Sequence, residues 1–419
     1  MVFDKVEIMS PVGSYESLMA AIQGGANSVY FGVEQLNMRS RSSNNFTLVD
    51  LVKISAICQE NNIKSYITIN TVLYDNEIEL MHSIIDAAKQ NKISAIIASD
   101  ISVMEYAISQ NVEVHISTQC NVTNTEAVKF YSRFADVIVT ARELNLNQVA
   151  QIAANIKKYN ITGPKGNLIQ LEVFVHGALC MAVSGKCYLS LDNMNYSANR
   201  GACLQLCRRE YTVKDKEEGL ELDIDNQYIM SPKDLCTIGF LDRIIKAGVS
   251  VLKIEGRGRS PEYVKTVTRC YREAADSILN GYYTDEKIAS WTKQLDSVYN
   301  RGFWDGYYLG RKLGEWTEKY GSQATKKKVY IGKITNYFAK LGVAEVKIET
   351  NSLNVGDEIL ITGESTGVVE MNVQEIRVEL KSVSNASKGD LCSIPMSTLV
   401  RRNDKLYLVA DNRDIELDT

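Results

Sequence analysis

Four cysteines stand close together in the stretch 172–208. Six residues separate the first pair, fifteen residues follow, and three residues separate the second pair, at Cys180, Cys187, Cys203 and Cys207. Disulfides persist mainly in oxidising compartments. The chain begins without the charged and apolar regions of a secretory signal, so we expect a reducing, cytoplasmic location. Thiolates gathered in such a compartment usually hold a soft metal centre.

The spacing of these cysteines favours an iron–sulfur cluster over zinc. Zinc sites generally combine two closely spaced cysteine pairs, and only Cys203 and Cys207 resemble such a pair. The irregular spacing therefore indicates a 4Fe-4S cluster, with zinc as the alternative. A further alternative is that the four thiols are simply buried side chains, as expected for Cys58, Cys270 and Cys392.

Length and composition describe a soluble globular protein. The 419 residues suffice for one large domain and one small one, and 45% are hydrophobic. No apolar run is long enough to span a membrane, so we expect no membrane partner. The net charge of -4 gives no overall attraction to nucleic acid, and we expect no DNA partner. Binding of RNA would depend on local basic patches.

Strand-like and helix-like segments alternate eight times in the first part of the chain. The expected strands are 6–9, 28–32, 65–70, 95–100, 112–117, 136–140, 171–176 and 251–255. The expected helices are 15–25, 48–61, 77–90, 103–109, 126–134, 146–159, 239–247 and 261–279. Eight such units predict an α/β fold, a (β/α)8 TIM-like barrel. An open doubly wound sheet would need a Gly-rich turn after the first strand, and residues 10–14 do not provide one.

The domain boundaries follow from changes in this pattern. We expect the barrel over 1–281, with a cysteine-bearing, cluster-binding insertion over 177–238 after strand 7. Residues 282–325 are rich in aromatic residues and glycine, which we interpret as apolar staples at a domain junction rather than a base-stacking surface. After the run Lys326–Lys328 the apolar period becomes two, which predicts a small all-β barrel domain over 326–419.

In such barrels the reacting groups stand at the C-terminal ends of the strands. The informative residues at these ends are Asn70, Asp100, Gln119, Arg142, His176, Cys180, Glu255 and Arg257. The candidate catalytic side chains are His176, Glu255 and Gln119. Alternation along a strand would give Glu172, Phe174 and His176 one common face. A hydrogen-bonded structural role is the alternative for His176.

Basic residues near these strand ends form a candidate anion site. Arginine binds carboxylates and phosphates through two parallel hydrogen bonds, so we expect Arg200, Lys253 and Arg257 to bind substrate. Solvated surface charge is the alternative interpretation.

Signatures of peptidase chemistry are largely missing. The chain has three histidines, with neither a His-Glu-x-x-His helix nor a Gly-x-Ser-x-Gly elbow. A dyad of Cys180 and His176 would leave the other three clustered cysteines unexplained.

Several motifs resemble the collagenase-like peptidase family of unknown catalytic type, the thirty-second such family. They are Glu-Val-Phe-Val-His-Gly-Ala-Leu-Cys at 172–180, Ser-Gly-Lys-Cys at 184–187, Asn-Arg-Gly at 199–201, Ser-Pro-Lys-Asp-Leu at 231–235 and Lys-Ile-Glu-Gly-Arg at 253–257. The pattern is most similar to the bacterial tRNA 5-hydroxyuridine hydroxylation proteins. The likeness extends over the whole expected barrel.

The resemblance implies a function. Relatives hydroxylate RNA bases with a 4Fe-4S cluster, and the matching ligands here would be Cys180, Cys187, Cys203 and Cys207, with Cys236 in reserve for Cys207. It implies a tRNA substrate, prephenate as co-substrate, and 5-hydroxyuridine as the product at the wobble position. Two alternatives stay open. One is a collagenase-like peptidase, and the other is a non-catalytic subunit of a hydroxylase complex with a homologous partner subunit.

Overall fold

The computed structural model describes residues 6–41, 45–214, 216–217, 221–222, 230–310, 314–319 and 321–412. The first five residues, where the sequence shows no secretory signal, lie outside these ranges. Eight parallel strands form a closed barrel: β1 (Glu7–Pro11), β2 (Ser28–Gly32), β3 (Lys64–Ile69), β4 (Ala95–Ala98), β5 (Val114–Ile116), β6 (Val137–Val139), β7 (Gln170–Gly177) and β11 (Val249–Ile254). Strand β11 pairs with both β7 and β1, which closes the ring. The predicted (β/α)8 fold is therefore confirmed.

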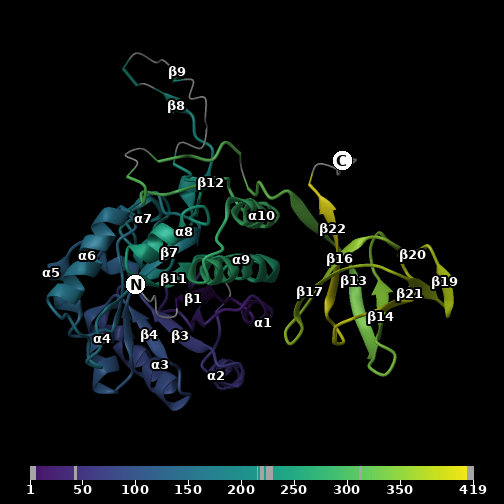
Figure 1. Ribbon diagram of the computed structural model, residues 1–419, viewed down its shortest axis with the longest axis horizontal. Helices are drawn as coiled ribbons and strands as arrows, with labels where there is room; N and C mark the ends of the chain where they lie inside the picture. The colour runs from purple at the N-terminus through teal and green to yellow at the C-terminus, as the bar shows by residue number, and fades with distance from the viewer. Residues whose placement is uncertain are drawn as a thin grey trace.

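Eight helices surround this barrel (Figure 1). They are α1 (Tyr15–Gln23), α2 (Asp50–Glu60), α3 (Ile78–Gln90), α4 (Ile101–Ser109), α5 (Thr125–Tyr131), α6 (Leu146–Lys158), α8 (Leu241–Lys246) and α9 (Pro261–Leu279). Four of them begin at a polar side chain that accepts a hydrogen bond from a free backbone N–H, at Ser14, Asp100, Asn124 and Asn145. Such caps offset the unpaired amides of a helix start, which explains why these helices begin where they do.

Strand β7 contains a β-bulge close to its C-terminal end. Phe174 and His176 pair with the consecutive residues Lys253 and Ile254 of β11, so Val175 is an extra residue. A bulge resets the alternation of side chains along a strand. His176 therefore shares the outward face of Ile254, while Phe174 keeps the inward face of Lys253. The prediction that His176 shares a face with Phe174 is wrong for this reason.

An insertion follows β7 and covers the mouth of the barrel. It contains α7 (Leu189–Met194), the short 3-10 turns η3 (Ala198–Arg200) and η4 (Leu206–Arg208), and a hairpin of β8 (Val213–Lys214) and β9 (Glu221–Leu222). The chain returns as β10 (Asp234–Cys236), which pairs antiparallel with the end of β7 through Gly177 and Leu235. Figure 1 shows α7 over the barrel and the hairpin projecting away from it.

The connecting segment packs on the barrel. It includes α10 (Asp285–Asp296) and β12 (Phe303–Trp304), which pairs with β10. Trp291, Trp304 and Tyr308 are buried in the same hydrophobic core as the barrel helices. The Tyr308 hydroxyl donates to the carbonyl of Phe174 at 2.7 Å. These rings are packed, so they are not available as a base-stacking surface.

The C-terminal module is all-β, as predicted. One antiparallel sheet contains β13 (Lys326–Phe338), β14 (Val343–Ile348), β16 (Glu358–Gly363), β17 (Gly367–Asn372), β18 (Ile376–Val378), β19 (Lys381–Val383), β21 (Leu391–Pro395) and β22 (Lys405–Asp411), and β15 (Ser352–Asn354) pairs with β20 (Asn385–Ser387). The module has a core of its own. It docks beside α1 and α9 (Figure 1), where the Gln23 amide donates to the carbonyl of Thr366 and accepts from the amide of Val368.

Candidate functional site

A cavity of about 230 Å³ lies at the C-terminal ends of the barrel strands, beneath the insertion. All four clustered cysteines line it, namely Cys180, Cys187, Cys203 and Cys207. Strands β2, β3, β7 and β11 supply its floor through Tyr30, Thr68, Phe174 and Lys253. Thus the structure brings the cysteine loop and the strand ends together around one space, which we call the sulfur cavity.

Two arginines hold the insertion in place, Arg200 by binding the barrel and Arg208 by joining the two ends of the insertion. Arg200 forms an ion pair with Glu77 at 2.7 Å and donates to the carbonyl of Val72 at 3.1 Å. Arg208 donates to the carbonyl of Leu179 at 2.7 Å and to the hydroxyl of Ser231 at 2.9 Å. Arg200 is therefore an anchor of the insertion. It does not line the sulfur cavity, so its predicted role in substrate binding has no geometric support.

Gly185 explains the local sequence between the first two cysteines. Its φ is +75°, and a Cβ at this position would lie 2.8 Å from Cγ of Gln119. Only glycine combines this backbone conformation with such a close approach at little cost. The Ser-Gly-Lys-Cys turn can therefore press against Gln119 and carry Cys187 to the cavity wall.

The thiols are close enough to influence one another. Burial raises the pKa of the Cys207 thiol, and negative charge on Cys180, Cys203 and Cys187 raises it further against the opposing effect of Arg208. Four thiolates in one space repel each other unless a cationic centre compensates them. Across the described ranges, no three His, Cys, Asp or Glu side chains come together as ligands of a single metal ion. An iron–sulfur cluster would accept sulfur donors that are more widely separated than the ligands of a single zinc ion, and Cys180, Cys187, Cys203 and Cys207 would hold it.

Four cationic side chains share the cavity with the thiols: Arg39, Arg142, Lys253 and Arg257. One carboxylate, Glu255, lies among them and forms an ion pair with Arg39 at 2.7 Å. Burial alone would raise the pKa of Glu255, but Arg39, Arg142 and Arg257 outweigh it and lower the pKa to about 2. Glu255 is thus a fixed negative charge near neutral pH, and a role as proton carrier does not fit it.

The remaining positive charge has room for an anion. Burial lowers the pKa of Arg257 to about 10, and Arg257 donates to the Thr68 hydroxyl at 2.9 Å. Arg142 lies over the Phe174 ring, 3.9 Å from its centroid, and its buried Nε has no hydrogen-bond partner among the described residues. A buried guanidinium N–H without a partner is costly. A carboxylate or phosphate oxygen would supply one.

Behind the cavity floor, buried charged groups form a chain through the barrel interior. Lys253 pairs with Glu172 at 2.6 Å, and both side chains are almost fully buried. Oε2 of Glu172 lies 3.9 Å from Nδ1 of His115. Neither atom has a hydrogen-bond partner in the described parts of the chain. On the other side of the ring, Nε2 of His115 lies 3.5 Å from Glu113. Lys253 is therefore held by an internal partner, which fixes its position in the cavity wall.

The predicted site residues separate into two groups. Gln119, Lys253, Glu255, Arg257 and the four clustered cysteines line the cavity. His176 and Cys236 do not, because they pair across β7 and β10 on the far side of the bulge. His176 packs against Tyr263, Tyr271 and Phe303, and burial lowers its pKa to about 3. Burial raises the pKa of Cys236 to about 11.

Sequence reasoning missed three wall residues as binding groups: Tyr30, Arg39 and Arg142. The Tyr30 hydroxyl donates to the carbonyl of Ile254 and lies 3.3 Å from Glu255. Arg142 was recognised at a strand end without a role. Position in the sequence was the available indication, since Arg39 and Arg142 follow barrel strands at the mouth. A single sequence does not show which loop side chains point into a cavity.

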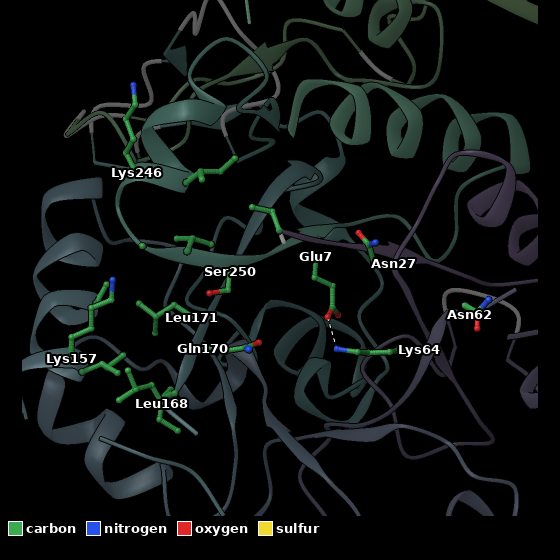
Figure 2. A pocket seen from close by; sticks show the side chains of 17 residues that line it. Glu7, Asn27, Asn62, Lys64, Lys157, Leu168, Gln170, Leu171, Lys246 and Ser250 are labelled. Atoms are coloured by element: carbon green, nitrogen blue, oxygen red, sulfur yellow. Dashed lines mark hydrogen bonds and ion pairs between the residues drawn. The ribbon is translucent and has the colours of Figure 1, made fainter. Parts of the chain in front are cut away.

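A larger hollow of about 800 Å³ lies at the opposite, N-terminal end of the barrel (Figure 2). Its buried carboxylate, Glu7, is satisfied by Lys64 at 2.9 Å and by the Tyr66 hydroxyl at 2.8 Å. No cysteine lines it. We call it the lower hollow.

The basic run at the start of β13 is engaged within the protein. Lys326 pairs with Glu358 at 2.6 Å, and Lys328 pairs with Glu262 of the barrel at 2.9 Å. These pairs engage two of the three lysines in this run, so it offers less positive charge for RNA binding than its sequence suggests. No helix in the described part of the chain has the length and apolarity needed to cross a membrane.

Comparison with known proteins adds family information. Residues 13–318 match the model of "Peptidase family U32". A "Collagenase" of Porphyromonas gingivalis is 63% identical over 401 residues, covering 96% of this chain and 97% of that protein. A "tRNA hydroxylation protein P" of Helicobacter pylori is 33% identical, covering 72% and 71%. A 23S rRNA 5-hydroxycytidine synthase of Escherichia coli is 36% identical, covering 66% and 40%. The family resemblance read from the motifs is thus confirmed, and the chain belongs to peptidase family U32.

Proposed function

We propose that this protein is an iron–sulfur-dependent tRNA hydroxylase that forms 5-hydroxyuridine at the wobble position, with prephenate as co-substrate. The observation that carries the proposal is the meeting of four cysteine side chains around one cavity at the mouth of the barrel. Relatives of this family are named both as collagenases and as RNA hydroxylation proteins. The chemistry of the cavity supports the RNA hydroxylase, as the following contacts explain.

The sulfur donors support a 4Fe-4S cluster held by Cys180, Cys187, Cys203 and Cys207. When bound, the cluster would supply one-electron chemistry or fix the loop that carries it. With all four thiols ligated, no cysteine in the cavity stays available as a nucleophile. Cys236 lies outside the cavity, which favours Cys207 as the fourth ligand.

The cationic wall supports an acidic co-substrate. Prephenate carries two carboxylates, and two guanidinium groups of the cavity wall are suited to bind them, the buried Arg257 and the partly buried Arg142. Glu255 and Arg39 hold the wall together, because each neutralises the charge of the other in a partly buried ion pair. Gln119 would contact the substrate base. Its side-chain oxygen accepts from Asn70 at 3.3 Å and from the Ser117 hydroxyl, which orients the amide.

A peptidase is the competing function, and the name of the relative from Porphyromonas gingivalis favours it. Thiol peptidases require a histidine beside the nucleophile. No histidine lines the sulfur cavity. His82 stacks on Tyr106 on the outer helices, His115 lies in the barrel interior, and His176 faces away from the mouth. A Cys180–His176 dyad is therefore not supported by the geometry.

The decisive experiment measures both activities on one preparation. The protein is purified anaerobically, its iron and sulfide are quantified, and it is incubated with unmodified tRNA and prephenate. Nucleosides are then analysed by mass spectrometry for 5-hydroxyuridine, and gelatin cleavage is followed in parallel. We expect the modified nucleoside from cluster-loaded protein alone, and none after removal of the cluster.

Other outcomes separate the alternatives. Cluster-free protein that cleaves gelatin at the full rate would establish the peptidase and refute our proposal. A non-catalytic subunit would give no product alone but would restore 5-hydroxyuridine in a deletion strain, and the Cys203→Ala variant would then indicate whether the cluster is needed for that support.

A further inference from the structure

A second chamber of about 470 Å³ lies beside the sulfur cavity at the barrel mouth. The two spaces share wall residues, namely Met38, Asn70, Gln119, Gly185 and Cys187. A molecule that extends from the sulfur cavity across Gln119 would therefore enter this chamber. Its remaining walls come from the loops after β3 and β4 and from the insertion.

Two exposed tyrosines stand at this chamber. Tyr188, just before α7, is 73% exposed, and Tyr74, in the loop before α3, is 56% exposed. Both rings line the chamber, and they belong to segments more than one hundred residues apart in the chain. Large aromatic side chains exposed beside a concave site commonly serve recognition.

The Tyr74 ring is held in place. The guanidinium of Arg200 lies 3.8 Å from its centroid, and Arg200 is itself fixed by the ion pair with Glu77. The backbone amide of Tyr74 also donates to Glu77 at 2.9 Å. The ring is thus a preorganised surface, and a ligand that stacks on it loses little entropy in ordering it.

Positive charge accompanies these rings. Lys186 lines the chamber and is exposed. Arg41 is exposed beside the mouth and lies over Tyr196, 5.3 Å from the ring centroid. Exposed aromatic rings interleaved with Lys and Arg are the pattern by which proteins bind single-stranded nucleic acid, because every base has a face that can stack.

We propose that this chamber, with Tyr74 and Tyr188 as stacking surfaces, binds an unpaired RNA base next to the base that enters the sulfur cavity. The inference rests on the proposed function. A base that leaves its stack loses contacts with its neighbours, and a second stacking site at the enzyme replaces them. Stacking on an aromatic side chain is independent of sequence, so the chamber contributes affinity and position.

Binding of a fluorescent RNA tests the proposal. An anticodon stem–loop carries 2-aminopurine beside the wobble uridine, and cluster-loaded full-length protein is titrated into it. The variants are Tyr74→Ala and Tyr188→Ala, with Tyr74→Phe and Tyr188→Phe to keep the ring. Tyr159→Ala is the matched control, because Tyr159 is 52% exposed on the outer helices and lines neither space.

We expect each alanine variant to raise Kd by roughly 5- to 100-fold and to reduce quenching of the probe. The phenylalanine variants and Tyr159→Ala should match the wild type. In turnover, the alanine variants should raise KM more than they lower kcat. Thermal unfolding is measured alongside, so that a folding defect is recognised.

The outcomes distinguish this inference from the proposed function. If wild-type protein binds and hydroxylates the RNA but the alanine variants bind equally well, the second chamber has no role and only this inference fails. If wild-type protein binds no RNA, the proposed function fails. A third outcome is that the protein binds gelatin peptides and no RNA, and that the alanine variants lose the peptide binding. The surface would then bind polypeptide, and the inference would be wrong.

Discussion

The two ends of the barrel carry hollows of opposite character. The lower hollow is more than three times the volume of the sulfur cavity, yet its buried carboxylate is already paired with Lys64 and Tyr66. The sulfur cavity is small and contains four thiols, an excess of cations and a guanidinium N–H that has no hydrogen-bond partner within the described ranges. Polar groups without partners, rather than volume, identify the candidate functional end, which is also the end where barrels of this fold carry their sites.

The largest expected effect is the loss of a cysteine from the sulfur cavity. Cys203→Ala should remove most bound iron and lower hydroxylation by about 100-fold or more, because even changes to groups that only support metal ligands cost about 10- to 100-fold. Iron and sulfide per chain and the rate of 5-hydroxyuridine formation are measured. Cys236→Ala, outside the cavity, should keep its iron. If Cys236→Ala lost its iron and Cys207→Ala kept it, Cys236 would be the fourth cluster ligand in place of Cys207.

The next effect compares ion pairs at the two ends. Lys253→Met should destabilise the protein by about 3–5 kcal/mol, because it removes the lysine partner of the fully buried Glu172. Lys64→Met at the lower hollow should cost at most about 1 kcal/mol, since Lys64 is 59% exposed in its side chain. Urea unfolding measures both. The double variant Lys253→Met with Glu172→Leu should regain most of the lost stability. If the two lysine variants lost equal stability, the ion pairs at the two ends of the barrel would not differ as we expect.

A smaller effect concerns acid stability. The pKa of Glu255 is lowered to about 2 from 4.5, so its carboxylate stabilises the fold above about pH 4.5, and this contribution is lost as the pH falls toward 2. Glu255→Gln should flatten this part of the stability curve by about 3 kcal/mol or less. Urea unfolding at successive pH values measures it. If the loss of stability at acid pH were the same in Glu255→Gln as in the wild type, the arginines would not be lowering the pKa of Glu255.

The smallest effect is expected at the lower hollow itself. Lys157 and Ser250 line it, and Lys157→Ala and Ser250→Ala should each change stability by no more than about 0.5 kcal/mol, because Lys157 is exposed and Ser250 is only partly buried. Hydroxylation should stay at the wild-type rate. A marked loss of turnover in either variant would give the lower hollow a function and weaken the contrast between the two ends.

The sequence predicted most of the fold, because buried parallel strands and amphipathic helices leave strong periodic patterns. Strand β2 and helix α9 lie at the predicted residues, 28–32 and 261–279. The pattern did not reveal α10 within the aromatic segment, nor the pairing of β10 with β7. Those features depend on packing against distant parts of the chain, which single-sequence patterns do not record.

The sequence predicted those site residues that are marked by residue type and spacing, and it did not predict the features that depend on backbone conformation. Cysteine spacing identified four residues that do line one cavity. His176 was misjudged because one extra residue in β7 reverses the face that it presents. Arg200 was taken for a ligand group, although it anchors the insertion through Glu77, a partner far away in the sequence.

The insertion leaves the barrel at Gly177 and rejoins it at Leu235, and these two residues are paired neighbours. The two ends of the insertion therefore lie side by side, whatever the length of the chain between them. Loop length changes closure entropy only slowly. The segment is consequently exchangeable: a longer, shorter or thiol-free version could be grafted onto the same two attachment points while the eight-strand register beneath it stays intact.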